Sequence, residues 1–177
     1  EADAKAIESS YDPDKGYDLD GNEHRDGLLW VAAKSDDPAK ISGALAEFMD
    51  FDTATYDPLP TRVSIGRLDH PSLDVYEVAV DNVNSALWFD EVDPDAVTAI
   101  TGILEGDGDL VHKVPATRGV SSMADDAALV SVLRAALAAK EPEVAASVLS
   151  KISRRPRDEA KAAEVQSMIE ARLDAPN

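Results

Sequence analysis

Three segments of this 177-residue chain begin with an acidic residue followed by proline and continue with apolar residues at helical spacing. The pairs are Asp37-Pro38, Asp93-Pro94 and Glu141-Pro142. An Asp side chain can cap the free N–H groups at a helix start, and proline fits the first helical position because that position donates no intrahelical hydrogen bond. These segments therefore predict amphipathic α-helices that each turn one face to a core.

The apolar residues that follow the first two starts recur at every third or fourth position, which places them on one helix face. They are Ile41, Ala44, Leu45 and Phe48 in the first helix, and Val97, Ile100 and Leu104 in the second. Gly106 follows the second helix where a C-terminal glycine belongs. An apolar group around Trp30 predicts another buried helix over 26–34, with a strand as the alternative.

Alternating apolar and polar residues predict two β-strands, over 61–69 and 73–81. The residues that join them, 69–72, suit a hairpin turn because they include Asp, Pro and Ser. A third strand is expected over 109–115. Residues 73–114 would then form a β-α-β unit.

The last part of the chain predicts helices joined by links of a few residues, so neighbouring helices should run antiparallel. Ser122 with Asp125 resembles a capping box at the start of the first of these helices. The second begins at Glu141-Pro142, and the third is expected to begin at Pro156.

Together these patterns predict an α+β fold: a small mixed β-sheet with packed helices and a C-terminal antiparallel helical segment. We expect an acidic α+β domain over 1–118 with the helical segment 119–177 packed on it. The length also permits a single domain over 1–177.

The negative charge is concentrated in one part of the chain. Residues 1–109 carry 26 Asp or Glu and 7 Lys or Arg, a net of −19, whereas residues 110–177 carry 9 acidic and 10 basic residues, a net of +1. Acidic adaptation of a whole organism would spread over the entire surface, so the split indicates a local cause. That cause is a cation site, a cationic partner, or an acidic face that keeps other molecules away.

The cation site would lie in the acidic segment 12–23, which resembles a calcium-binding EF-hand loop. Calcium takes six to eight oxygen ligands, and such a loop supplies them at fixed positions. The candidate metal ligands are Asp12, Asp14, Asp18, Asp20 and Glu23. The segment departs from the pattern at Tyr17, where the turn needs glycine, and at Gly16, which offers no side-chain oxygen. It is therefore either a solvated acidic loop or a Ca²⁺ site that stabilises the fold.

A cationic partner would contact the exposed carboxylates between residues 69 and 95. The candidate partner-binding residues are Asp69, Asp74, Asp90, Glu91, Asp93 and Asp95. One basic cluster lies near the C-terminus and consists of Lys151, Arg154, Arg155, Arg157 and Lys161. This cluster would either contact phosphate or an acidic partner, or offset the dipole at a helix C-terminus, and the second interpretation is favoured.

Several function classes are excluded or lack a motif. The absence of cysteine excludes disulfides, Cys-ligated zinc, iron–sulfur clusters and thiol catalysis. No P-loop, dinucleotide fingerprint or nucleophile elbow is present, and the histidines, His24, His70 and His112, are widely spaced. A sequence pI of 4.3 opposes direct binding of nucleic acid. No apolar run approaches the ~18–20 residues that span a bilayer, so we expect a soluble chain.

The sequence does not determine the cellular compartment of the protein. The chain begins with Glu1 and not with Met, which indicates a processing site or a boundary within a longer protein. It is either cytoplasmic or exported after N-terminal processing.

We therefore expect a non-catalytic acidic interaction module, or a subunit of a larger assembly, that binds a cationic protein surface. Such a protein would be an inhibitor, an immunity-like or DNA-mimic-like protein, or a structural subunit, and it could form homo-oligomers. The alternatives are a calcium-stabilised protein and a carboxylate-dependent hydrolase that uses an acidic pair such as Asp90 and Glu91. Carboxylates on a convex face would favour the partner, and two carboxylates inside a cleft would favour hydrolysis.

Overall fold

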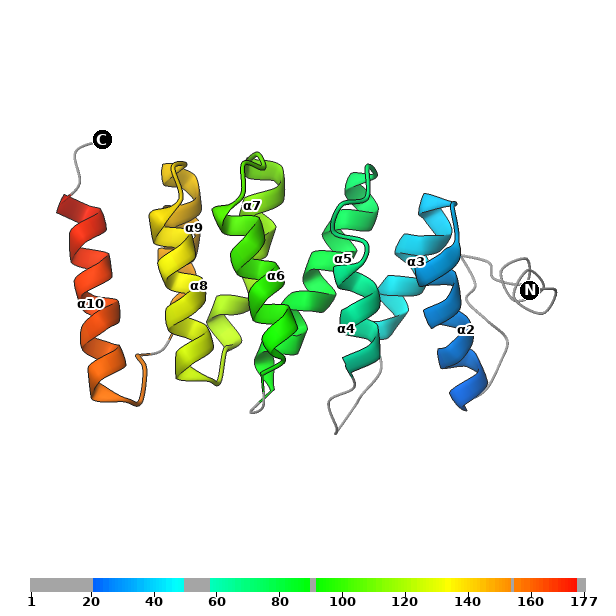
Figure 1. Ribbon diagram of the computed structural model, residues 1–177, viewed down its shortest axis with the longest axis horizontal. Coiled ribbons are helices and arrows are strands. Elements are labelled where there is room, and N and C mark those ends of the chain that lie inside the picture. The colour runs from blue at the N-terminus through cyan, green and yellow to red at the C-terminus, as the bar shows by residue number, and fades with distance from the viewer. Residues whose placement is uncertain (1–20, 50–57, 90–91, 154, 175–177) are drawn as a thin grey trace. The chain divides into compact units, whose positions relative to one another are not determined.

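The structure, a computed structural model, describes residues 21–49, 58–89, 92–153 and 155–174, and every regular element in these ranges is helical (Figure 1). The first elements are α2 (Gly21–Lys34), α3 (Pro38–Met49), α4 (Pro58–Ile65), α5 (Leu73–Ser85) and the 3₁₀ helix η1 (Ala86–Trp88). The others are α6 (Pro94–Glu105), α7 (Leu110–Ala116), the 3₁₀ helix η2 (Arg118–Ser122), α8 (Asp126–Ala138), α9 (Pro142–Lys151) and α10 (Glu159–Asp174). The fold is all-α.

The predicted α+β fold with a small mixed β-sheet is therefore wrong. The three expected strands, 61–69, 73–81 and 109–115, correspond to α4 with its following turn, α5 and α7. In α5 the fully or nearly buried side chains follow helical spacing: Val75, Tyr76, Ala79, Val80 and Val83. The apparent alternation of Tyr76, Val78 and Val80 arose because a short valine-rich segment satisfies both periods. With no strand in these segments, the expected β-α-β unit over 73–114 is also wrong.

The helices expected at acidic–proline pairs are confirmed. α3 begins at Pro38, with a carboxylate oxygen of Asp37 accepting from the backbone N–H of Ala39 at 3.0 Å. α6 begins at Pro94 and α9 at Pro142. The helix expected over 26–34 is confirmed as α2, which begins earlier, at Gly21.

Two other helix starts differ from the prediction. α8 is capped by Asp125, whose Oδ1 accepts from the N–H of Ala128 at 2.7 Å, while Ser122 ends the preceding 3₁₀ helix. The predicted capping box is therefore wrong. α10 begins at Glu159 and not at Pro156, because Asp158 accepts at Oδ1 from the N–H of Lys161 at 2.9 Å.

The chain divides into two compact units, Glu1–Val83 and Asn84–Asn177. Whether residues 1–118 form a domain apart from 119–177 stays a prediction. In the first unit, α2 packs against α3 and α4 around a buried apolar core. Its buried members are Leu28, Val31, Ala32, Ile41, Ala44, Leu45, Phe48, Val75 and Ala79.

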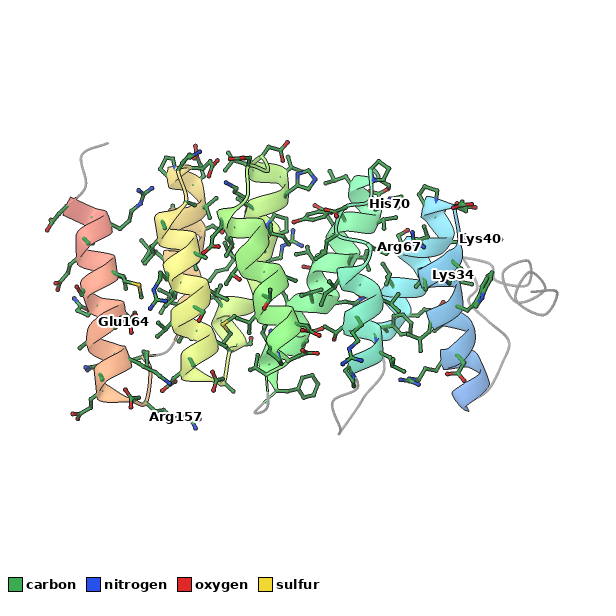
Figure 2. All side chains as sticks on the ribbon, viewed as in Figure 1. Lys34, Lys40, Arg67, His70, Arg157 and Glu164 are labelled. Atoms are coloured by element: carbon green, nitrogen blue, oxygen red, sulfur yellow. The ribbon has the colours of Figure 1, made fainter. Side chains whose placement is uncertain are left out.

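Polar side chains connect the helices of this unit by bonds to backbone carbonyls. Arg67, labelled in Figure 2, donates from Nε to the carbonyl of Ala32 at 2.7 Å and from Nη2 to that of Ser35 at 3.2 Å. These carbonyls lie at the C-terminal end of α2, where a cation offsets the helix dipole. Asn82 donates to the carbonyl of Leu45 at 2.8 Å and so ties α5 to α3.

In the second unit, α8 is the central helix. It packs against α6, α9 and α10, and α7 packs against α6 and α9. The buried face of α8 consists of Ala128, Leu129, Val130, Val132, Leu133, Ala135, Ala136 and Leu137. Alanine on this face allows neighbouring helices to approach closely. None of the helices in the described part of the chain has the length and hydrophobicity that a bilayer span requires.

Candidate functional site

The predicted partner-binding carboxylates have different roles in the described residues. Asp69 and Asp74 are exposed, in the turn before α5 and in its first turn. Asp95 is exposed in the first turn of α6. Asp93 is only 8% exposed, and its Oδ1 accepts from the N–H of Asp95 at 2.8 Å. Asp93 therefore holds the start of α6 and offers little surface to a partner.

Asp90 and Glu91 lie outside the described residues. Their role in a partner surface or in a hydrolytic site stays a prediction. Asp69 and Asp74 belong to the first unit and Asp95 to the second.

An exposed tryptophan precedes this acidic segment. Trp88 ends η1 with 51% of its surface exposed, whereas Ala86 and Leu87 beside it are buried and η1 packs against α6. The sequence analysis did not identify Trp88 as a candidate binding residue, because the candidates were chosen by their negative charge. The available signal was the aromatic pair Trp88-Phe89 before Asp90 and Glu91.

The predicted calcium ligands cannot be placed together. Asp12, Asp14, Asp18 and Asp20 lie outside the described residues, and Glu23 lies in the first turn of α2. Within 21–49, 58–89, 92–153 and 155–174, no three His, Asp or Glu side chains are grouped so that they could hold a metal ion. The calcium site stays a prediction.

The histidines have local hydrogen-bonding roles or lie within a helix. His24 lies in α2, and Nδ1 of His70 accepts from the N–H of Ser72 at 3.1 Å. Nδ1 of His112 lies 2.6 Å from Oδ1 of Asp109, and this hydrogen bond lowers the pKa of the Asp109 carboxyl. The contacts of His70 and His112 stabilise the turns before α5 and α7.

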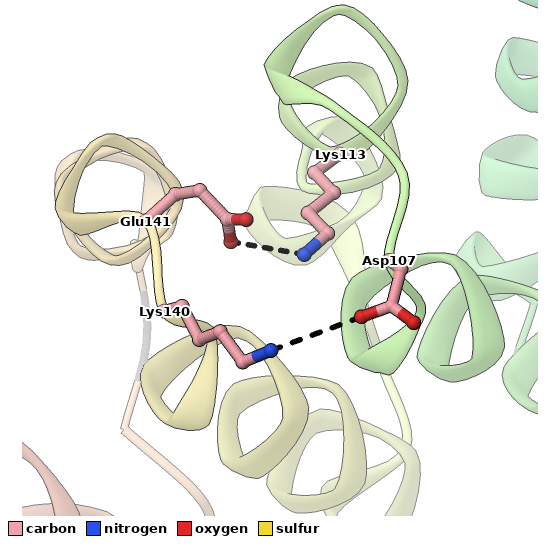
Figure 3. Close-up of polar contacts among 4 residues, drawn as sticks. All are labelled: Asp107, Lys113, Lys140 and Glu141. Carbon is pink, nitrogen blue, oxygen red and sulfur yellow. Dashed lines mark hydrogen bonds and ion pairs between the residues drawn. The ribbon is translucent and has the colours of Figure 1, made fainter.

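A nearly buried lysine joins α7 to the start of α9 (Figure 3). Lys113 is 3% exposed, and its Nζ lies 2.9 Å from Oε2 of Glu141, the residue that precedes α9. The hydrogen bond from Lys113 lowers the pKa of the Glu141 carboxyl. Beside this pair, the exposed side chains of Lys140 and Asp107 approach to 3.8 Å. Both contacts lie within the second unit and join neighbouring helices.

The described residues of the predicted basic cluster differ in their surroundings, and whether they act as one cluster stays a prediction. Lys151, the last residue of α9, donates from Nζ to Oγ of Ser147 at 2.6 Å and to Oγ1 of Thr117 at 3.3 Å. Burial, and then the charge of Arg118, lower the pKa of the Lys151 ammonium. Arg155 and Arg157 are exposed, Lys161 is half-buried, and Arg154 lies outside the described residues.

A groove of about 500 Å³ runs between the link after α9 and one face of α10. We call it the α10 groove. Its lining residues are Ile152, Ser153, Arg155 and Pro156 from the link, and Ala162, Val165, Gln166 and Ile169 from α10. Sequence reasoning identified Arg155 but could not place it beside a groove.

Comparison with protein-family models, with curated protein sequences and with solved structures finds no match to this chain.

Proposed function

We propose that this protein is a non-catalytic interaction module that binds a cationic protein surface. The observation that carries the proposal is Trp88, an exposed tryptophan that stands two residues before the acidic segment 90–95 in the sequence. Tryptophan is enriched among the residues that dominate binding energy at protein interfaces. An aromatic anchor followed in the sequence by several carboxylates suits a partner that presents an apolar pocket ringed by Lys and Arg.

The charge distribution supports a partner surface with positive charge. Residues 84–109 contain seven Asp or Glu and no Lys or Arg. Such a field accelerates association with a basic surface and opposes an acidic one. We expect Trp88 to determine how long the complex lasts and the exposed carboxylates to determine how fast it forms.

The first experiment captures partners on the immobilised full chain from a native lysate at low salt. The matched baits carry Trp88→Ala, Asp95→Lys, or Glu170→Lys as the control. Glu170 is exposed on α10, so its replacement makes the same charge change away from η1 and α6. We expect a basic protein that is retained by the wild type and the control, and lost from the Trp88→Ala bait.

The second experiment measures association and dissociation rates of the captured protein. Asp95→Lys should slow association, and the effect should fall as salt rises, because screening shortens the reach of surface charges. Trp88→Ala should mainly speed dissociation. Complexes that survive molar salt unchanged, or retention by all three variant baits, would contradict the proposal, as would turnover of a substrate by the isolated chain.

A further inference from the structure

Three side chains of the second unit form a hydrogen-bonded cluster that contains a hydroxyl nucleophile and an amine. Oγ of Ser147 lies 2.6 Å from Nζ of Lys151 and 2.8 Å from Oγ1 of Thr117. Ser147 and Lys151 are four residues apart in α9, so they lie on the same helix face. Thr117, which ends α7, is fully buried and also contacts Nζ of Lys151, at 3.3 Å. A hydroxyl within reach of a base, with a third group that orients the pair, is the arrangement that activates a serine nucleophile.

The hydrogen bonds of this cluster permit two arrangements of protons. Thr117 has one hydroxyl hydrogen and two acceptors at 2.8 Å, the carbonyl of Val114 and Oγ of Ser147. If Thr117 donates to Val114, Ser147 donates to Thr117, and Lys151 donates to Ser147 as an ammonium. If Thr117 donates to Ser147, the hydrogen of Ser147 can point to Lys151, which then accepts as a neutral amine. In this second arrangement Lys151 can remove the proton from Ser147.

The surroundings of Lys151 favour its neutral form more than those of an exposed lysine do. Burial, and then the positive charge of Arg118, lower the pKa of the Lys151 ammonium. Among the described residues, Lys151 forms no ion pair with a carboxylate, and its contacts are with oxygens of Thr117 and Ser147. The elements that pack against α9 are α7, α8 and η2. Besides Arg118, their charged or titratable side chains are His112, Lys113, Asp126 and Arg134.

We propose that Ser147 accepts an acyl group from an activated ester, with Lys151 as the general base. Both side chains are half-buried, so a dissolved ester can reach them. Oγ of Ser147 attacks the carbonyl carbon, and its proton passes to Nζ of Lys151. The bond from the carbonyl carbon to the leaving oxygen then breaks, the leaving group departs as an anion, and Lys151 releases the proton to water. The product is an acyl ester on Ser147, and this modification is independent of the binding proposed for Trp88.

The test uses p-nitrophenyl acetate and the full chain. The wild type should release one equivalent of p-nitrophenolate in a burst, which absorbance measures, and peptide mass spectrometry should locate the acetyl group on Ser147. Exposed lysines also react with this ester, so the rate of acetylation at Ser147 itself is compared. Because the reaction needs the neutral amine, this rate should rise with pH and level off below 10.5, the ordinary pKa of lysine.

The decisive variant is Lys151→Arg, which keeps the positive charge and the hydrogen-bond donors but cannot take up a proton. It should slow acetylation of Ser147 at least about 100-fold, since general base catalysis contributes that much or more. Ser147→Ala should abolish the burst. Ser150→Ala is the matched control, because Ser150 is exposed one turn along α9 and its Oγ donates to the carbonyl of Ser147 at 2.8 Å. This control should leave the rate unchanged, and thermal unfolding checks that each variant is folded.

Other results would overturn the proposal. These are the absence of a burst from the wild type, an unchanged rate in Lys151→Arg, or acetylation of Ser150 as fast as that of Ser147. An acetyl group on Lys151 supports the proposal if it requires Ser147, because the amine can attack the neighbouring ester. The same group on Lys151 in Ser147→Ala would overturn it, since the amine would then be the nucleophile. Continued p-nitrophenolate release after the burst would contradict the non-catalytic function but leave Ser147 as the acyl acceptor.

Discussion

Nζ of Lys113 lies 2.9 Å from Oε2 of Glu141, and the two ends of this ion pair have different access to water. The Lys113 side chain is 4% exposed, whereas that of Glu141 is 29% exposed (Figure 3). Removing Glu141 and removing Lys113 should therefore destabilise the protein by different amounts. A carboxylate without its lysine can be hydrated, but an ammonium without its carboxylate stays inside the protein.

The first prediction follows from this asymmetry. Glu141→Gln should destabilise the protein more than Lys113→Met does, because only the first variant leaves a buried charge without its counter-ion. Lys113→Met retains the apolar stem and should change the free energy of unfolding by about 1 kcal/mol or less. Urea unfolding followed by circular dichroism measures both. If the two variants lose equal stability, or Lys113→Met loses more, the destabilisation does not arise from a buried ammonium that lacks its counter-ion.

The second prediction concerns pH. The pKa of Glu141 is lowered from its ordinary value of 4.5 by the hydrogen bond from Lys113. A carboxyl with a lower pKa in the folded state contributes stability that is complete above the unfolded value and is lost as pH falls through the folded one. The difference in stability between wild type and Glu141→Gln should thus be constant near neutrality and shrink below about pH 4.5. A difference that is unchanged at pH 3 would contradict the assigned cause.

The helices that could be predicted from the sequence are those with a chemical start signal and a long apolar stripe. α3 and α6 combine Asp, Pro and a stripe that ends in the core at Phe48 and Leu104. Their signals agree at several levels, which is what makes a local prediction dependable. Helices α4, α5 and α7 lack such agreement.

The failed strands have a common physical cause. α4 and α7 have 8 and 7 residues, lengths at which a strand and a helix are equally plausible, and all three segments contain the β-branched residues that favour strands. In α4 the buried residues are the polar Thr61 and Ser64, and Ser64 donates to the carbonyl of Pro60 at 2.8 Å. Such back-bonding satisfies a buried hydroxyl only in a helix, and the sequence pattern alone does not reveal it.

The candidate site was predictable only in part. The sequence identified exposed Asp95 together with Asp93, although Asp93 serves the helix start. It grouped Lys151 with Arg155 because they are close in sequence. Tertiary packing separates their roles: Lys151 donates to Thr117, which lies 34 residues away, and Arg155 lines the α10 groove.

The third prediction distinguishes the two candidate caps of α8. Asp125→Ala should lower stability by about 1 kcal/mol, because the N–H of Ala128 loses its acceptor. Ser122→Ala should change stability by less than about 0.5 kcal/mol, since Ser122 is exposed at the end of η2. Thermal unfolding of both variants checks this. If Ser122→Ala loses more stability than Asp125→Ala, Ser122 and not Asp125 caps α8.

The fourth prediction compares two glycine-to-alanine changes in the second unit. A Cβ at Gly119 would lie 2.8 Å from Oδ1 and 3.2 Å from the backbone oxygen of Asn84, and Asn84 is buried with its Nδ2 bonded to the carbonyl of Pro115 at 3.0 Å. Asn84 cannot move away without losing that bond. Gly119→Ala should therefore cost roughly 1–3 kcal/mol.

Gly102 is the matched control, because a Cβ there meets no atom within 4 Å and the position is exposed inside α6. Alanine reduces the conformational freedom of the unfolded chain and favours the helix, so Gly102→Ala should raise the free energy of unfolding by about 0.5–1 kcal/mol. Urea unfolding under one set of conditions compares the two variants directly. If both changes shift stability in the same direction, the close packing of η2 on Asn84 is not the cause of the loss at Gly119.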